Sequence, residues 1–288
     1  MAVGALVRAT NSGDACPDWP RCNGRWIPPL EYHQLIEYSH RLTASVVIVL
    51  IAVLAVLAWR LRSSAPRVFR AAAIAMGLVI AQALLGAVVV WSRLEALNVT
   101  AHLATAMLLV AALVYATVEA FYVEAPVAGV ASGLTRLAWS VAAAAFLLML
   151  VGTVVRGAGA GLVFPDWPLM GGRVVPDLGA VEPAVHFAHR ALALAVGVLV
   201  AWLAIRARRD PAAAPVVATL AATAAALYFA QALTGAANVW TRLATVPTIA
   251  HVTLGGMLWG TLVATAAVAS IRPRAAVRGA TVRRGSKS

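Results

Sequence analysis

The chain has 288 residues, of which 62% are hydrophobic and 12% charged, and its mean hydropathy is +0.85. This composition lies far outside the range of soluble globular domains and predicts an integral membrane protein. The formal charge of +12 could indicate a nucleic-acid binder. The basic residues, however, lie in particular connections and at the C-terminus rather than on one amphipathic face, so we expect no nucleic-acid partner.

Seven apolar runs are long enough to cross a hydrocarbon core of about 30 Å as helices. Each run is continuous and does not alternate with a period of two, which favours helices over strands. In chain order the predicted spans are Leu42–Trp59, Ala71–Trp91, Val99–Val118, Leu137–Val155, His186–Ile205, Ala214–Trp240 and Thr248–Ile271.

Basic residues predict the orientation of these spans. Arginine and lysine gather in the connections after the first and fifth spans and in the C-terminal tail. By the positive-inside rule these segments are cytoplasmic, which puts the loop with Cys16 and Cys22 outside. The connection from Glu119 to Arg136 holds one arginine and two glutamates, so its orientation depends on its neighbours. We predict a multi-pass protein of the plasma membrane with a cytoplasmic C-terminus.

The two halves of the sequence repeat each other. Pro-Asp-Trp-Pro occurs at 17–20 and again at 165–168, and after one inserted residue the offset between the halves is 149. At that offset Ala81–His102 and Ala230–His251 are identical at 12 of 22 positions, with Gln, Trp, Arg and His in register. Apolar bias alone would hardly produce this agreement. We therefore predict an all-α protein of two pseudo-symmetric four-helix bundles that arose by internal duplication.

The first of the eight expected helices is short. A full span precedes Arg156, whereas only Met1–Val7 precedes its counterpart Arg8, so about a dozen residues of a helix are missing. Because an incomplete bundle would expose interior polar groups to lipid, we expect an upstream start in preference to a shortened variant. The predicted organisation is an N-terminal half at 1–123, a cytoplasmic linker at 124–136, a C-terminal half at 137–271 and a basic cytoplasmic tail at 272–288.

Four histidines form two pairs with the same spacing. His40 and His102 are 62 residues apart, and so are His189 and His251. One hairpin separates the members of each pair, so both should lie near the outer ends of helices in one bundle. Two facing histidines without carboxylates or thiolates at metal-ligand spacing favour axial ligation of haem iron over a zinc site. The alternative is a pair of interhelical hydrogen-bonding histidines, which the repeated spacing disfavours.

An arginine directly follows the first histidine of each pair, at Arg41 and Arg190. The propionates of a haem need cations at the aqueous edge of the site. These guanidinium groups are therefore candidates to bind propionates by charge-assisted hydrogen bonds. The equally favoured alternative is that they anchor the helix ends at the lipid headgroups.

A carboxylate accompanies the histidines in the first half only. Glu37 lies one helical turn before His40, where the second half has His186. Ionisable residues near lipid are by default functional candidates, and Glu37 could orient or deprotonate a reacting group. The alternative is a hydrated glutamate at a helix mouth.

The two cysteines, Cys16 and Cys22, also occur in the first half only, where the second half has Phe164 and Met170. In an oxidising compartment they can form a disulfide. A structural clip and a redox-active pair remain equally open.

These motifs resemble the heme A synthase family, membrane enzymes that convert heme O to heme A for terminal oxidases. The resemblance covers nearly the whole chain, through CPDWPRCNG, IEYSHR, AHLATAMLL, FPDWPLMGG, HFAHR and VWTRLATVPTIAHVTLGG. It implies two four-helix halves, with haem b as cofactor on His189 and His251. It also implies that the substrate heme O lies near His40 and His102 and that Glu37 matches an essential acidic residue of the family.

The resemblance further implies that Cys16 and Cys22 form a disulfide and assist electron or substrate handling. The implied reaction oxidises the C8 methyl group of the porphyrin to a formyl group, through two hydroxylations and loss of water from a gem-diol. Haem iron can supply the reactivity that an unactivated methyl group needs, while the protein supplies binding and orientation. The implied partners are heme O, heme A, heme O synthase, the terminal oxidase assembly machinery and the lipid bilayer.

Two other classes of function fit part of the pattern. A di-haem b-type electron carrier predicts symmetrical sites and needs neither Glu37 nor the cysteines. A haem-holding assembly factor would bind the cofactor without converting it. Product analysis with heme O separates both from the enzyme. A transporter built from repeats is disfavoured, because the halves have parallel orientation and no broken helix is evident.

Overall fold

The computed structural model describes residues 1–122 and 132–271, and within these ranges the chain is all-α without β-strands. Seven of its helices are long and apolar enough to span a membrane, and the first is short. The predicted all-α membrane protein with eight helices is therefore confirmed. The elements are α1 (Ala2–Ala9), α2 (Tyr32–Arg60), α3 (Pro66–Trp91), α4 (Ala96–Tyr122), α5 (Ser132–Gly157), the 3-10 helix η1 (Ala160–Leu162), α6 (Val181–Arg209), α7 (Pro215–Trp240) and α8 (Thr245–Ser270).

Each of the seven predicted spans lies within one helix, except that Ala214 and Ile271 are one residue outside the ends of theirs. Most helices extend beyond the apolar run that predicted them. α2, for example, begins at Tyr32, well before the predicted Leu42. An apolar run reports only the part of a helix in hydrocarbon, whereas the backbone hydrogen bonds continue through polar residues at the interface. Residues 132–136 of the predicted linker belong to α5. The rest of that linker from 124, and the predicted basic tail at 272–288, lie outside the described residues.

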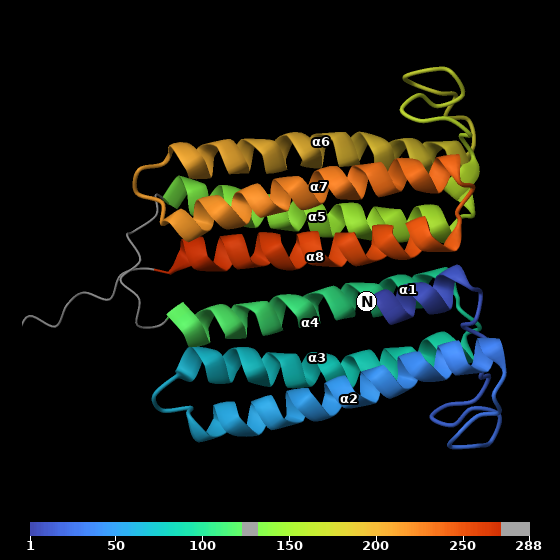
Figure 1. The fold of residues 1–288 in the computed structure, drawn as a ribbon, viewed down its shortest axis with the longest axis horizontal. Helices are drawn as coiled ribbons and strands as arrows, with labels where there is room; N and C mark the ends of the chain where they lie inside the picture. The colour runs from blue at the N-terminus through green and yellow to red at the C-terminus, as the bar shows by residue number, and fades with distance from the viewer. Residues whose placement is uncertain (123–131, 272–288) are drawn as a thin grey trace, which may run out of the picture.

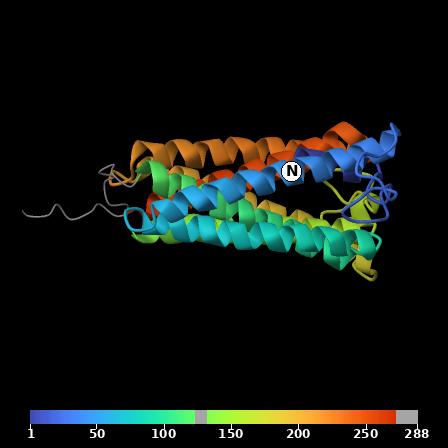
Figure 2. The ribbon, with the colours of Figure 1, turned by 90° about the horizontal axis from the view of Figure 1, so that it is seen from below.

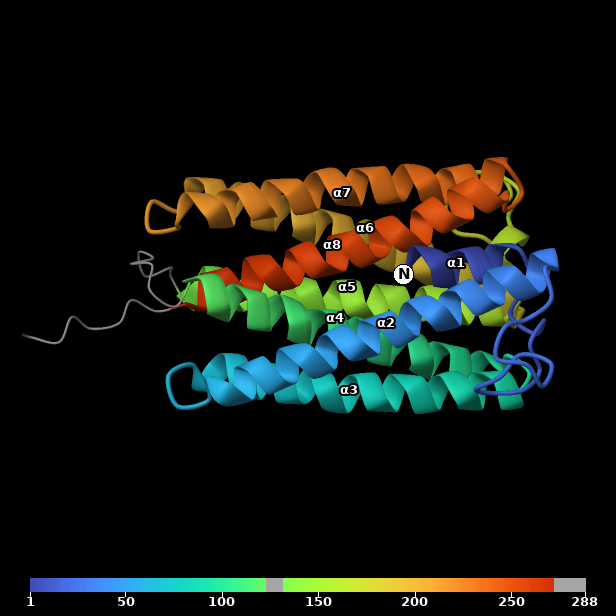
Figure 3. The same cartoon turned by 60° about the horizontal axis from the view of Figure 1, so that its bottom comes forward.

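The helices form two groups of four that lie side by side (Figures 1 and 3). In the second half α5, α6, α7 and α8 form a closed ring, in which each helix packs on two neighbours. In the first half α1, α2, α3 and α4 pack in the same order, but the short α1 packs mainly on α2 and on α8 of the other half. In both halves the helices that carry the histidine pairs, α2 with α4 and α6 with α8, lie diagonally across the ring.

The two halves contact each other through α1 and α4 of the first half and α5 and α8 of the second. The indole Nε1 of the buried Trp259 in α8 donates a hydrogen bond to the carbonyl oxygen of Met107 in α4, at 2.9 Å. The hydroxyl groups of Thr100 in α4 and Thr153 in α5 are hydrogen-bonded at 3.0 Å. Packing and polar contacts of this kind drive the association of membrane helices, because lipid supplies no hydrophobic driving force between them.

Two long loops, 10–31 and 158–180, close the same end of the bundle (Figure 2). In the first loop a carboxylate oxygen of Asp18 accepts a hydrogen bond from the backbone N–H of Gly24, at 2.8 Å. In the second, Asp166 accepts one from the N–H of Gly172, also at 2.8 Å. These backbone hydrogen bonds lower the pKa of both carboxyl groups below the ordinary value for aspartic acid. The aspartate of each Pro-Asp-Trp-Pro motif thus fixes the loop that contains it.

The tryptophan of the same motif packs each loop against a helix end. Trp19 meets Trp91 at the end of α3 edge-on, with 6.3 Å between the ring centroids. Trp167 meets Trp240 at the end of α7 in the same way, at 5.8 Å. Both loops therefore cover the helix ends with one geometry, although the internal duplication itself stays a prediction.

Candidate functional site

The four predicted histidines lie near the loop-covered end of the bundle, about two turns inside the helices that carry them. His40 is in α2 and His102 in α4, while His189 is in α6 and His251 in α8. All four are partly buried. The two helices that carry each pair lie diagonally across their half of the bundle. The structure therefore places the two residues of each predicted pair on opposite helices at a similar depth below the loops.

A glycine on a neighbouring helix makes room for each histidine ring. A Cβ atom added at any of these glycines would lie 3.2–3.4 Å from Cε1 of the histidine, tighter than most carbon contacts. Only glycine leaves the ring this space, and the four glycines match in pairs at the offsets of the repeat. The contacts pair Gly4 with His40, Gly86 with His102, Gly152 with His189 and Gly235 with His251.

The ring nitrogens of His102 in α4 and His251 in α8 have different hydrogen-bond partners. Nδ1 of His251 lies 3.2 Å from the carbonyl oxygen of Gln231. Because a carbonyl only accepts, Nδ1 carries the proton and Nε2 keeps a lone pair for a metal. In the first half, a hydrogen bond of 3.0 Å joins Nε2 of His102 to the side-chain nitrogen of Gln82. Nε2 of His251 is thus free to act as a ligand, whereas the corresponding nitrogen of His102 is bonded to an amide.

The donor set fits a haem. Nδ1 of His102 and Nδ1 of His189 are buried without a hydrogen-bond partner, so these rings have bonding capacity that the protein does not use. Among residues 1–122 and 132–271, no group of three or more His, Cys, Asp or Glu side chains could hold a metal ion. Each histidine pair would therefore supply two ligands only, which suits an iron whose other ligands come from a porphyrin.

Glu37 is buried at the mouth of the first histidine pair, with 4% of its surface exposed. Its Oε2 accepts a hydrogen bond from the backbone N–H of Cys16, at 2.8 Å. Its Oε1 accepts one from Nη2 of Arg41 in a salt bridge of 2.5 Å. A charged donor and an oriented backbone N–H thus hold the carboxylate in one position.

The two predicted propionate-binding arginines contact the loops. Nη1 of Arg41 donates to the carbonyl oxygens of Asp18 (2.7 Å) and Arg21 (2.6 Å). Nη1 of Arg190 donates to the carbonyl oxygens of Asp166 (3.0 Å) and Leu169 (2.9 Å). Nη2 of Arg190 is buried and has no hydrogen-bond partner among the described residues. Both arginines therefore tie a loop to the helix that carries a histidine, and Arg190 keeps one free donor nitrogen.

His186 takes the place of Glu37 in the second half. Its Nδ1 donates to the carbonyl oxygen of Ala160 at 2.7 Å, and its Nε2 accepts from Nε of Arg190 at 3.0 Å. The ring of Phe164 packs against it, with 5.4 Å between the centroids. The second half thus fills this position with a hydrogen-bonded histidine and has no carboxylate there.

Cys16 and Cys22 form a disulfide, as predicted. Both residues are buried, with 0% and 1% of their surface exposed. Thiol–disulfide exchange requires a thiolate to reach one of the sulfur atoms. In this conformation the loop would have to open first, so the geometry is that of a structural clip whose Cys16 N–H also holds Glu37.

Sequence reasoning assigned no role to the two glutamines and the four glycines that contact the histidines. Their signal was present, because Gln82 and Gln231 are in register in the repeat. Each glycine is likewise matched by another glycine in the other half. Which ring each of them contacts depends on neighbouring helices.

The sequence matches the profile of the COX15-CtaA family, described as cytochrome oxidase assembly protein, over residues 1–35 and 30–263. It is also similar to three bacterial proteins named Heme A synthase. The protein of Symbiobacterium thermophilum is 31% identical over 274 residues, covering 90% of this chain and 87% of that protein. That of Shouchella clausii is 32% identical over 254 residues (85% and 84%), and that of Lysinibacillus sphaericus 31% over 271 residues (90% and 87%).

Proposed function

This chain belongs to the COX15-CtaA family of cytochrome oxidase assembly proteins, and from that premise we propose that it is a heme A synthase, a membrane oxidoreductase that converts heme O to heme A. The observation that carries the proposal is the similarity to relatives of this name over most of both chains. The site agrees with it, because both histidine pairs, Glu37 and the disulfide lie at one end of the bundle.

The two halves divide the work. His189 and His251 hold a resident haem b, and His40 and His102 hold the substrate heme O. Two observations support this division. Nε2 of His251 is free for a ligand bond because Nδ1 is bonded to a carbonyl, which suits a permanent cofactor. Nε2 of His102 is bonded to an amide that a substrate can displace, which suits a group that binds and leaves.

The chain's own residues position the substrate and move protons. Oxidation of the C8 methyl group to a formyl group removes four electrons and four protons and adds one oxygen atom at the oxidation level of water. A haem b held by His189 and His251 would supply the electron-transfer centre. Glu37 is the carboxylate next to the substrate pair, and each of its oxygens keeps a lone pair beyond its present hydrogen bond. It therefore accepts a proton from the reacting group while Arg41 and the Cys16 N–H keep its orientation.

The loop-covered end faces the outside of the cell. The connection between α2 and α3 and the C-terminal end of α6 carry arginines at the opposite end, which is then cytoplasmic. In this orientation the two loops separate the histidine pairs from outside water. Nη2 of Arg190 is the free donor for a propionate. Heme O synthase and the oxidase assembly machinery are the partners that supply the substrate and use the product.

The test of the proposal is the identity of the pigments in membranes of cells that express the chain and are supplied with heme O. Extraction and mass measurement should detect heme A, with its formyl group, in these cells and not in cells with an empty vector. An inserted chain that leaves heme O unchanged would contradict the enzyme. If it retained haem b in both halves, it would favour the di-haem electron carrier. If it retained heme O alone, it would favour the haem-holding assembly factor.

A further inference from the structure

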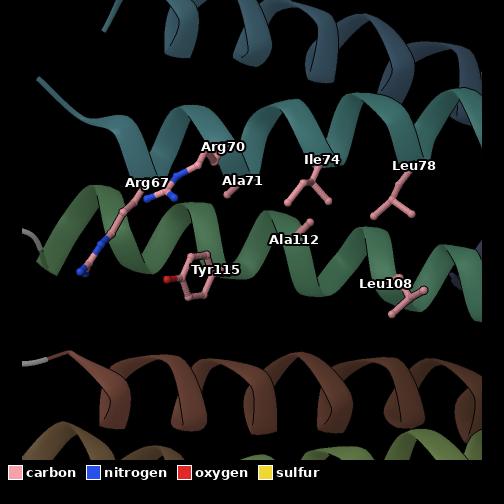
Figure 4. Close-up of a pocket in the computed structure, with 8 residues that line it drawn as sticks. All are labelled: Arg67, Arg70, Ala71, Ile74, Leu78, Leu108, Ala112 and Tyr115. Atoms are coloured by element: carbon pink, nitrogen blue, oxygen red, sulfur yellow. The ribbon is translucent and has the colours of Figure 1, made fainter. Parts of the chain in front are cut away.

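A groove between α3 and α4 lies at the end of the bundle opposite the histidines, with a volume of about 610 Å³ (Figure 4). We call it the α3–α4 groove. Its basic end is formed by Arg67, Arg70 and Tyr115, and its apolar walls by Ala71, Ile74, Leu78, Leu108 and Ala112. From Arg70 to Leu78 the walls run for about 12 Å along α3. The groove is open at the surface of the bundle, since Ile74 is 58% exposed and Leu108 45%.

The basic end is built around a buried carboxylate. Glu119 of α4 is 5% exposed, and Nη1 of Arg67 lies 3.5 Å from its Oε1. A buried ionised group at a membrane helix end is expensive and needs a partner. This pair lies at the groove, while the guanidinium of Arg70 makes one long hydrogen bond within residues 1–122 and 132–271, of 3.4 Å, to the carbonyl oxygen of Pro66. The two arginines and Glu119 leave one net positive charge.

Helix packing does not require these polar groups. At the offset of 149, the second half has Val216, Thr219, Ala264 and Val268 in place of Arg67, Arg70, Tyr115 and Glu119. There α7 and α8 pack closely, with Val268 fully buried. The same helix pair thus forms without a charged cluster. Helix packing therefore does not account for the cluster. The orientation of the chain accounts for arginines at this end, and a ligand that neutralises the net charge accounts for their place beside a buried glutamate and an apolar groove.

We propose that the α3–α4 groove binds one anionic phospholipid from the leaflet at this end of the bundle. Its phosphodiester, with one negative charge, lies on the two arginines and complements their net charge with Glu119. One acyl chain lies along the apolar walls. Arginine suits this role, because its planar fork binds two phosphate oxygens at once. The proposal is independent of the catalytic assignment, since no residue of the groove contacts the histidine pairs in the interactions described above.

The proposal is tested by native mass spectrometry of the purified full chain, released from nanodiscs that contain equal amounts of phosphatidylglycerol and phosphatidylcholine. The chain should retain one phosphatidylglycerol in preference to phosphatidylcholine. Arg67→Gln with Arg70→Gln should weaken this retention by about 25-fold, because each arginine contributes roughly fivefold in affinity for an anionic headgroup. The matched control is Arg206→Gln with Arg209→Gln. It removes two exposed arginines from the C-terminal end of α6, which lies at the same end of the bundle as the groove.

A second pair of variants tests the groove without changing charge. Ile74→Trp fills the groove from its exposed rim, whereas Ile80→Trp adds the same bulk on α3 at a site that is 54% exposed and lies outside the groove. Retention should be lost in the first and kept in the second. Equal retention of phosphatidylglycerol in the Ile74→Trp and Ile80→Trp variants would overturn the proposal. So would an equal loss of it in the two arginine double variants. Equal amounts of the two lipids on the unmodified chain would also overturn it, because this is the behaviour of ordinary annular contact.

Discussion

The two halves of the molecule share the arrangement of helices, loops and histidines but differ in the residue at one matched position. One turn before the first histidine of each pair, the first half has Glu37 and the second half has His186. Both side chains are buried, and both are bonded to the arginine that follows the histidine and to the backbone of a loop. In both halves this side chain therefore connects the loop to the helix. In the first half the connecting group is a carboxylate, and in the second it is an imidazole.

Under the proposed function, this difference would let two similar halves take two roles. The shared features are those that position a large planar group: a diagonal histidine pair and a glycine against each ring. The unshared features are chemical, namely a carboxylate, a disulfide and an amide on Nε2 of His102. If binding follows the shared features and reactivity the unshared ones, as we propose, substitutions at matched positions will separate the two.

The largest difference is expected at Glu37. Glu37→Gln keeps the size of the side chain and an oxygen that can accept from the Cys16 N–H, but removes the charge and the proton acceptor. Formation of heme A from heme O should fall by at least about 100-fold, the contribution of a positioned acid–base group. The measurement is the ratio of heme A to heme O in membranes with equal amounts of protein. His186→Gln, at the matched position, should lower the ratio much less, and equal losses would mean that both residues are structural.

The histidine pairs should separate cofactor from substrate. His189→Ala and His251→Ala should each remove the absorption band of haem b from the purified protein, because an axial ligand is lost. His40→Ala and His102→Ala should keep that band and lose heme A formation. Absorption spectra and product analysis of the same preparations check both. Loss of the resident band in all four variants would show that the halves do not divide in this way.

The disulfide should affect stability in the first half. Replacing both cysteines, Cys16→Ser with Cys22→Ser, should lower the free energy of unfolding by about 2 kcal/mol, since a short cross-linked loop is released. The thermal midpoint of the purified protein measures this loss. Because both sulfurs are buried, a reductant should leave the midpoint of the folded wild type unchanged during an incubation at neutral pH. Rapid reduction under those conditions would favour the redox-active pair, and the double variant serves as the control for other effects of the reductant.

The glycine contacts predict a smaller and local effect. At Gly152 an added methyl group would lie 3.2 Å from Cε1 of His189, whereas at Gly77 it would meet nothing within 4 Å. Gly152→Ala should therefore move the ring and lower the amount of haem b retained on purification. Gly77→Ala should keep the haem and stabilise its helix by up to about 1 kcal/mol. The absorbance ratio of haem to protein distinguishes the two, and equal ratios would show that the glycine is not needed at the ring.

The smallest effect should be equal in the two halves. The pKa values of Asp18 and Asp166 are lowered by backbone hydrogen bonds, so the folded loops favour the charged carboxylates. Their contribution is complete above the ordinary value of about 3.9 and is lost as the pH falls through the lowered folded value. Hydrogen exchange at the amides of Gly24 and Gly172 should accelerate together over that range. Asp18→Asn should accelerate exchange at Gly24 alone at neutral pH, and a change in both loops would contradict their independence.

The sequence by itself determined the class of the protein and supplied the candidate residues of the site. A long apolar run must satisfy its backbone polar groups internally, so composition alone specified membrane helices. The repeat register singled out the four histidines, and its exceptions singled out Glu37 and the cysteines. Helix ends were predicted less well, because polar residues continue a helix beyond hydrocarbon, as at Tyr32–Ser39 of α2.

Only the tertiary structure decided what each of these residues touches. The bond from the Cys16 N–H to Glu37, the loop carbonyls on Arg41 and the carbonyl on Nδ1 of His251 all join segments that are far apart in the sequence. Hydrogen bonds of this kind depend on distances of a few ångströms between separate elements, which no local pattern encodes. The pairing of Arg67 with Glu119 is of the same kind. Both residues can be read from the sequence, but their meeting at one groove follows from the packing of α3 on α4.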